Sequence, residues 1–163
     1  MKELLTFRQE VLQSDAQHVR ELTTSTGFFM DAEIDVAVEL VEERLSKGES
    51  SGYYFVFAEQ GGRVVGYTCF GPIPCTMASF DLYWIAVHDS CRGQGIGKAL
   101  MRKSEECIAA MGGTRVYIET SFRAQYVPTR QFYFACGYQE AAVLADFYAP
   151  GDGKVIYLKV LGA

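Results

Sequence analysis

The sequence predicts a mixed α/β domain of the α+β class, with a central sheet of about seven strands flanked by about four helices. Three observations lead to this fold class. Strand-like and helix-like segments follow one another in the order β-α-α-β-β-β-α-β-α-β-β, two pairs of strand segments are joined by short glycine turns, and a strand–helix–strand crossover lies mid-chain. A chain of 163 residues, 49% hydrophobic and 21% charged, suffices for one core, so we expect a single domain over residues 1–163.

The N-terminal third predicts one strand followed by two helices. Apolar residues alternate over residues 4–12, which is typical of a strand. Ser14 and Gln17 have the spacing of a capping box, which opens a short helix that stops near Gly27. An apolar stripe at helical spacing predicts a second, amphipathic helix over residues 34–48.

The middle third predicts a hairpin, a further strand and a long helix. Residues 53–59 and 63–70 are aromatic and β-branched runs joined across a Gly-Gly turn. Residues 79–88, SFDLYWIAVH, predict the next strand. The glycine-rich stretch CRGQGIG then opens a helix that runs to about Met111.

The C-terminal third completes the sheet. Residues 114–121 predict a strand, and Pro128 suits the first turn of a short helix that Gly137 ends. Two last strands, around residues 138–147 and 154–161, flank a Pro-Gly-Asp-Gly turn.

Composition excludes several classes of protein. The net charge of −5 argues against wrapping of a nucleic acid backbone and permits a cationic substrate such as an amine. Five cysteines without a C-x-x-C pair and two distant histidines favour neither a disulfide framework nor a metal site. No apolar run has the length of a membrane span or the form of a signal peptide. We therefore expect a cytoplasmic protein without metal, membrane or nucleic acid partners, and a homodimer is left open.

The glycine-rich stretch over residues 91–97 has the composition of an anion site at the start of a helix. Glycines let a ligand approach the backbone, and free amides at the helix start point towards it. Lys98, Arg102 and Lys103 lie where helices favour acids, and no acid appears before Glu105. Neither the Walker pattern nor the dinucleotide pattern fits the stretch. A glycine turn with a solvated basic face is the alternative.

Two motifs in register resemble the GNAT superfamily of N-acetyltransferases. Arg92, Gly95 and Gly97 fill the fixed positions of its [QR]-x-x-G-x-[GA] signature, and residues 129–138, TRQFYFACGY, resemble its A-x-x-[LF]-Y-x-x-x-G-[FY] segment. The resemblance implies acetyl-coenzyme A as co-substrate, with its diphosphate on the amides of residues 93–98 and its pantetheine arm beside the strand over residues 84–87. The residues implied for the cofactor are Ile85, Ala86, Val87, Arg92, Gly93, Gln94, Gly95, Ile96, Gly97 and Lys98.

The resemblance also suggests residues for the chemistry. Tyr133 is the candidate acid that protonates the departing thiolate, and packing of its ring in a short helix is the alternative. Asp81 and Glu119 lie in predicted strands, where acids are disfavoured, and either is a candidate base. A water chain ending on one of them is equally allowed, as is a solvent-facing role for both. The two strands should splay apart where the thioester lies.

Aromatic residues mark the expected acceptor side: Phe28, Tyr83, Phe122 and Tyr126. A cation could stack on such rings, although ordinary packing is an equal alternative. The resemblance implies direct transfer of an acetyl group to a primary amine of a small cationic metabolite, an amino acid or a protein N-terminus. A domain that senses acyl-coenzyme A without turnover is the alternative function.

Overall fold

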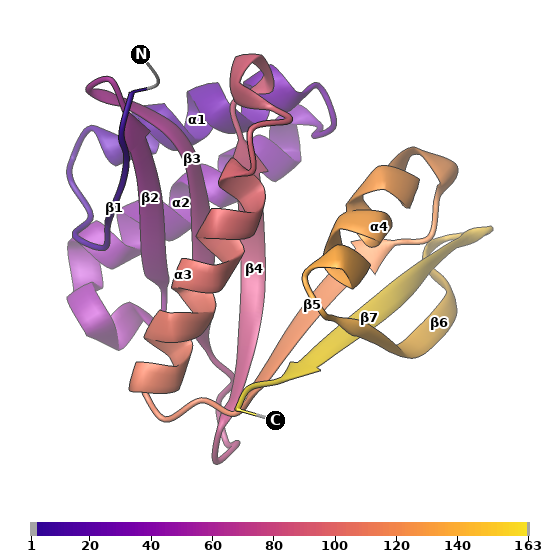
Figure 1. Ribbon diagram of the computed structural model, residues 1–163. Helices are drawn as coiled ribbons and strands as arrows, with labels where there is room; N and C mark the ends of the chain where they lie inside the picture. The colour runs from indigo at the N-terminus through magenta and orange to yellow at the C-terminus, as the bar shows by residue number, and fades with distance from the viewer. Residues whose placement is uncertain (1–2, 163) are drawn as a thin grey trace. The chain divides into compact units, whose positions relative to one another are not determined.

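The computed structural model describes residues 3–162 and contains the predicted elements in the predicted order (Figure 1). The strands are β1 (Leu5–Arg8), β2 (Tyr54–Gln60), β3 (Arg63–Pro72), β4 (Ser79–Val87), β5 (Arg115–Ser121), β6 (Gln139–Ala149) and β7 (Asp152–Val160). The α-helices are α1 (Asp15–Thr26), α2 (Asp31–Lys47), α3 (Ile96–Ala110) and α4 (Val127–Ala135). Short 3-10 helices lie at Gly48–Ser51, Asp89–Cys91 and Ala124–Tyr126.

The strands of the described residues form one mixed sheet of seven, in the order β1-β2-β3-β4-β5-β7-β6. The pairs β1–β2, β2–β3, β5–β7 and β6–β7 are antiparallel, whereas β4 and β5 are parallel. The parallel pair is the one connected through a helix, because parallel neighbours need a long crossover. The predicted fold class is thus confirmed.

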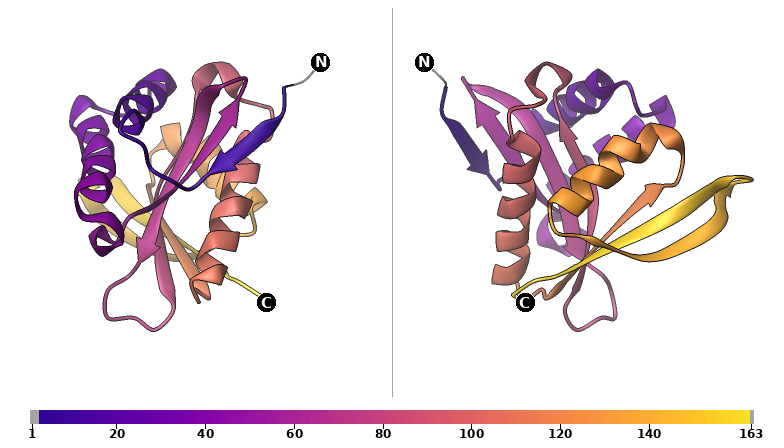
Figure 2. Two further views of the ribbon diagram at one scale, coloured as in Figure 1. Left: turned by 90° about the vertical axis from the view of Figure 1, so that its left-hand side faces the viewer. Right: turned by 45° about the vertical axis from the view of Figure 1, so that its right-hand side comes forward.

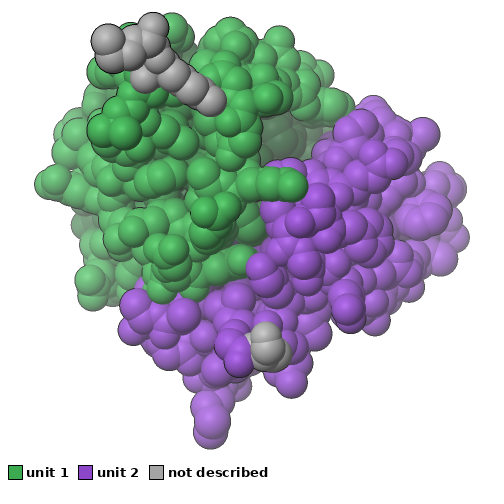
Figure 3. All heavy atoms as spheres, in the orientation of Figure 1, with its two compact units in different colours: residues 1–71, 84–107 green, residues 72–83, 108–163 purple. Residues whose placement is uncertain are grey.

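The chain divides into two compact units, coloured separately in Figure 3. The first comprises the described residues up to Gly71 together with Trp84–Cys107, and the second comprises Pro72–Tyr83 and the described residues from Ile108 onward. Strand β4 contributes to both, so the division does not follow one break in the sequence. A single domain over residues 1–163 stays a prediction.

In the first unit, α1 and α2 cover one face of the strands and α3 covers the other (Figures 1 and 2). On the α3 face, the Thr68 and Ser104 hydroxyls form a buried hydrogen bond of 2.5 Å. A Cβ atom at Gly66 would lie 2.8 Å from Leu100, so glycine lets α3 approach β3 closely. The buried cluster on the α1–α2 face consists of Val19, Leu22, Ala37, Val38, Val41, Phe55, Phe57, Tyr67, Cys69 and Ala86.

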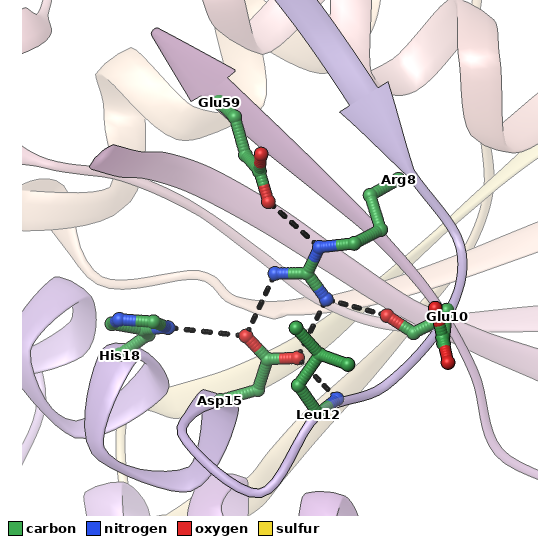
Figure 4. Close-up of polar contacts among 6 residues, drawn as sticks. All are labelled: Arg8, Glu10, Leu12, Asp15, His18 and Glu59. Carbon is green, nitrogen blue, oxygen red and sulfur yellow. Dashed lines mark hydrogen bonds and ion pairs between the residues drawn. The ribbon is translucent and has the colours of Figure 1, made fainter. Parts of the chain in front are cut away.

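A polar network anchors β1 to α1 and β2 (Figure 4). The Arg8 guanidinium donates to both carboxylate oxygens of Asp15, at 2.7 and 2.9 Å, and to Glu59 at 2.7 Å. Asp15 is fully buried, and the Leu12 amide donates to it at 2.7 Å. Burial raises the pKa of the Asp15 carboxyl, but the hydrogen bonds from Arg8 and Leu12 lower it by more than burial raises it. The pKa of Asp15 is therefore below its usual range. Asp15 therefore stays ionised inside the unit.

This network explains two wrong predictions at the N-terminus. Ser14 makes no side-chain capping bond, because Asp15 holds the turn through the Leu12 amide instead. Strand β1 ends at Arg8 rather than near residue 12, because the chain leaves the sheet there to reach Asp15. At the next helix, the Glu33 carboxylate accepts from the Met30 amide at 2.8 Å.

In the second unit, α4 packs against β7. The Tyr133 and Tyr157 rings lie 5.6 Å apart between centroids, and the Phe134 ring meets Tyr157 edge-on at 5.3 Å. Strands β6 and β7 form a hairpin whose register shifts between Leu144 and Ala149, where Asp146 adopts a positive φ of 56°.

Candidate functional site

The glycine loop of the first unit leads from β4 into α3. Gly93 and Gly95 have φ values of +75° and +79°, a region that glycine adopts without the steric cost paid by other residues. The surroundings are open, because a Cβ atom at either glycine would meet nothing within 4 Å. Residues 92–95 and Lys98 are exposed, whereas Ile96 is buried and can offer a ligand only its backbone.

The amides of residues 93–98 form a row of hydrogen-bond donors. The first hydrogen bond of the α3 ladder runs from the Ala99 amide to the Gly95 carbonyl, at 3.1 Å. Across the described chain, no carbonyl or side chain accepts a hydrogen bond from the six preceding amides. The first turn of α3 also contains no acid. This arrangement of donors and cations suits an anion with several oxygens, such as a diphosphate.

Strand β4 leads into this loop, and its ladder with β5 includes Ser79, Phe80 and Asp81. The splay of the two strands beside the thioester stays a prediction. Whether residues 85–87 pair with a pantetheine arm stays a prediction.

In the second unit, Asp81, Glu119 and Lys154 share one face of the sheet. Asp81 pairs with Tyr117 in the β4–β5 register, and Glu119 follows two residues later on the same face. Glu119 pairs with Ile156 of β7, and Lys154 lies two residues before it, again on that face. The Lys154 ammonium lies 2.7 Å from the Glu119 carboxylate, and the Lys154 side chain is only 12% exposed.

The two candidate bases have different surroundings. Glu119 is held in its ion pair, whereas no cation lies within ion-pairing distance of Asp81 among residues 3–162. Burial raises the pKa of the Asp81 carboxyl, the nearby Glu119 charge raises it further, and Lys154 opposes the shift. A carboxylate with a raised pKa is a stronger base than an ordinary aspartate.

Tyr133 lies on the opposite face of the β5–β7 pair. Its ring packs on Tyr157, and because Tyr157 follows Ile156, its side chain points away from the face that carries Glu119. Burial raises the pKa of the Tyr133 hydroxyl, and the neighbouring Cys136 and Tyr157 add to the shift. Tyr133 is thus a protonated hydrogen-bond donor at neutral pH. The structure does not bring the candidate acid and the candidate bases together on one face.

The expected aromatic acceptor side already carries the chain's own cations. In the second unit, Arg130 lies over Phe122, with 5.1 Å to the ring centroid, and Arg123 lies over Tyr126 at 5.6 Å. In the first unit, Arg92 lies over Phe28 at 5.5 Å. Because an arginine already lies over each of these three rings, less ring surface is available to a cationic acceptor than the sequence predicts.

Sequence reasoning missed Lys154 and Arg130. Lys154 becomes visible as a partner of Glu119 only through the β5–β7 register, which strand patterns do not fix between distant segments. Arg130 could have been noticed, because it lies three residues before Tyr133 and therefore on the same helix face.

The model of the acetyltransferase (GNAT) domain family matches residues 51–140 of this chain. The chain belongs to the GNAT family of acetyltransferases. A crystallised protein from Desulfovibrio desulfuricans, described as belonging to the same family, is 44% identical, with 96% of this chain and 99% of that chain covered and a TM-score of 0.95. The expectation of a GNAT acetyltransferase is confirmed at the level of the family.

Two further relatives extend the comparison. An uncharacterised N-acetyltransferase of Methanocaldococcus jannaschii is 32% identical over 110 residues, which cover 64% of this GNAT chain and 65% of that relative, just under two thirds of its length. A Salmonella typhimurium protein solved with its cofactor acetyl-CoA shares the fold, with 16% identity, coverage of 98% and 95%, and a TM-score of 0.74.

No helix within residues 3–162 has the length and apolarity to cross a membrane. In the same range, no cluster of three or more His, Cys, Asp or Glu side chains is arranged to hold a metal ion.

Proposed function

We propose that this GNAT protein transfers the acetyl group of acetyl-CoA directly to a primary amine. The observation that carries the proposal is the row of amides at residues 93–98, which have no acceptor in the described chain and lie above a basic helix turn. The diphosphate would accept hydrogen bonds from these amides, and the exposed Arg92 and Lys98 would add positive charge. The main chain of residues 85–87 would pair with the uncharged pantetheine arm.

Asp81 is the proposed base. It removes a proton from the acceptor ammonium, directly or through water, and the amine nitrogen then attacks the thioester carbon. The new C–N bond forms as the C–S bond breaks, and the electron pair of that bond leaves on sulfur. Asp81 is preferred to Glu119 because Lys154 already neutralises Glu119 at 2.7 Å. An α-amine, with a pKa of about 7.7–8.0, needs this base less than a lysine-like amine at about 10.4.

Tyr133 is the proposed donor to the leaving thiolate. Its hydroxyl gives a hydrogen bond to sulfur as negative charge develops there, and its proton completes the thiol of coenzyme A. Since burial raises the pKa of Tyr133, and a thiol titrates near 8.5, full proton transfer is uphill. Stabilisation of the developing charge by the hydrogen bond is therefore the larger part of the role, and solvent returns the proton.

The test measures thiol release from acetyl-CoA across a panel of amines, together with the affinity for coenzyme A. We expect release with at least one amine, and a fall in kcat of about 100-fold or more in Tyr133→Phe with little change in affinity. Phe134→Leu, on the same helix but 52% exposed, is the control and should retain turnover. Tight binding without release for any amine would favour the sensor function instead. Cytoplasmic location and homodimer formation stay predictions.

A further inference from the structure

Arg130 is a cation without a carboxylate partner in the second unit. Its Nη1 donates to the carbonyl oxygens of Ser121 and Arg123, at 2.9 and 3.0 Å, and its guanidinium lies over the Phe122 ring. Over residues 3–162, no carboxylate lies within ion-pairing distance of Arg130. The two carbonyls fix the position of the guanidinium but leave its charge uncompensated.

The neighbouring cations are compensated. Arg123 lies 3.2 Å from the Asp152 carboxylate, and Lys154 lies 2.7 Å from Glu119. The segments that carry these pairs are joined by a hydrogen bond from the Phe122 amide to the Gly153 carbonyl, at 2.9 Å. Of these three cations, Arg130 is therefore the one whose charge no carboxylate compensates, in a chain whose net charge is −5.

The guanidinium retains donors for a ligand. A guanidinium has five N–H groups in a planar fork, and the two carbonyl contacts use one nitrogen of Arg130. The remaining edge matches the two oxygens of a carboxylate, which guanidinium groups bind in a bidentate manner. Because the side chain is half-buried and anchored, little conformational entropy is lost when an anion binds.

The position on α4 indicates where the anion comes from. Arg130 and Tyr133 are three residues apart and are neighbours on one helix face. In the proposed function, on which this inference rests, Tyr133 faces the thioester sulfur. The pantetheine arm next to the thioester has no ionised group, and the diphosphate and 3′-phosphate of coenzyme A both lie beyond that arm, at the nucleotide end of the molecule. An anionic group one helical turn from Tyr133 must then belong to the acceptor.

We propose that Arg130 binds a carboxylate of the acceptor, so that the acceptor is an amine that also carries a carboxylate, such as an amino acid. A purely cationic acceptor is disfavoured, because Arg130 repels it and the Phe122 and Tyr126 rings are covered by guanidinium groups. Of the acceptor classes considered from the sequence, the structure favours the amino acid.

The experiment compares each of the common amino acids with its amide as acetyl acceptor, using wild type, Arg130→Gln and Arg130→Lys. Wild type should prefer the carboxylate over the amide of the best pair by about 10-fold or more. Arg130→Gln should lower kcat/KM for that carboxylate by about 10- to 150-fold and leave the amide unchanged, and Arg130→Lys should recover part of the loss. Arg115→Gln, an exposed arginine on β5, removes the same charge and should change neither substrate.

Binding measurements separate the two proposals. N-acetylglycine and N-acetylglycinamide are titrated into the protein loaded with coenzyme A, and the affinity for coenzyme A is measured for each variant. Weaker binding of N-acetylglycine to Arg130→Gln supports the carboxylate site even where no amine is acetylated, which would refute only the transferase proposal. Equal losses for carboxylate and amide, or a loss of coenzyme A affinity in Arg130→Gln, overturns the assignment of Arg130.

Discussion

Gly95→Ala tests the backbone conformation of the anion loop with the smallest possible change. Gly95 has φ +79°, and a Cβ atom there would contact nothing within 4 Å. Alanine therefore introduces no clash with the protein, and its whole effect comes from placing an L-residue in the left-handed region. That cost is about 1–2 kcal/mol.

The strain can appear in one of two measurements. If the loop of the free protein keeps its conformation, the strain lowers the free energy of unfolding by about 1–2 kcal/mol. Alanine also restricts the unfolded chain, which offsets about 0.4–1 kcal/mol of that loss. If the free loop relaxes instead, coenzyme A must restore the conformation, and its affinity falls by roughly 5- to 30-fold. Gly95→Asn should show about half of either effect, because asparagine tolerates this region better.

Calorimetric titration of coenzyme A and denaturant unfolding measure both quantities on the same samples. Gly52→Ala is the matched control: Gly52 has φ +77°, also has nothing within 4 Å of a Cβ atom, and lies outside the loop. It should lose stability to a similar extent and keep its affinity for coenzyme A. Unchanged stability together with unchanged affinity in Gly95→Ala, or an equal loss of affinity in Gly52→Ala, refutes the reasoning.

Three further predictions concern the interior and the candidate base. Asp15→Asn leaves Arg8 partly buried without its main partner and should cost roughly 3 kcal/mol in unfolding free energy at pH 7. Because folding lowers the pKa of Asp15, this difference from wild type should shrink once the pH falls below about 4. A difference that stays constant with pH contradicts the assignment. Tyr67→Phe should raise the unfolding free energy by about 1–3 kcal/mol, because the buried Tyr67 hydroxyl has no hydrogen-bond partner among the described residues. A loss of stability would point to a buried water instead. Asp81→Asn should lower kcat/KM by about 100-fold or more, whereas Glu119→Gln should keep activity. Glu119→Gln should also move the acid limb of the pH–rate profile to lower pH, because the Glu119 charge helps to raise the pKa of Asp81. The reverse pattern would make Glu119 the base.

The sequence predicted the order of all the elements because their signals are local. Periodicity of two or of about 3.6 residues, and glycine or proline at the boundaries, depend on neighbours in the chain. The errors arose where a long-range contact replaced a local one, as when Asp15, held by Arg8, took over the turn that Ser14 was expected to cap.

The candidate site, which stays a prediction, could likewise be proposed from the sequence only where its signals are local. The glycine loop and Tyr133 lie in contiguous motifs, so both could be named from the sequence. The sequence left Asp81 and Glu119 as equal candidates, because alternation shows which residues share a face but not which cations lie opposite them. Our preference for Asp81 rests on Lys154, which lies 35 positions after Glu119 (154 − 119 = 35) on a strand whose register follows from the folded sheet.

The placement of Tyr133 and Asp81 on opposite faces of the sheet limits how protons can move. In acyl transfer through a covalent intermediate, one catalytic histidine accepts a proton and later passes it to the leaving group. A residue that moved the proton of the amine to the thiolate in this way would have to reach both reactants from one side. Here the β5–β7 pair lies between the α4 face and the face that carries Asp81 and Glu119. In the proposed function, each group therefore exchanges its proton with solvent after every turnover. Loss of Asp81 should then lower kcat/KM and remove the acid limb of the pH–rate profile, whereas loss of Tyr133 should lower the plateau without moving that limb.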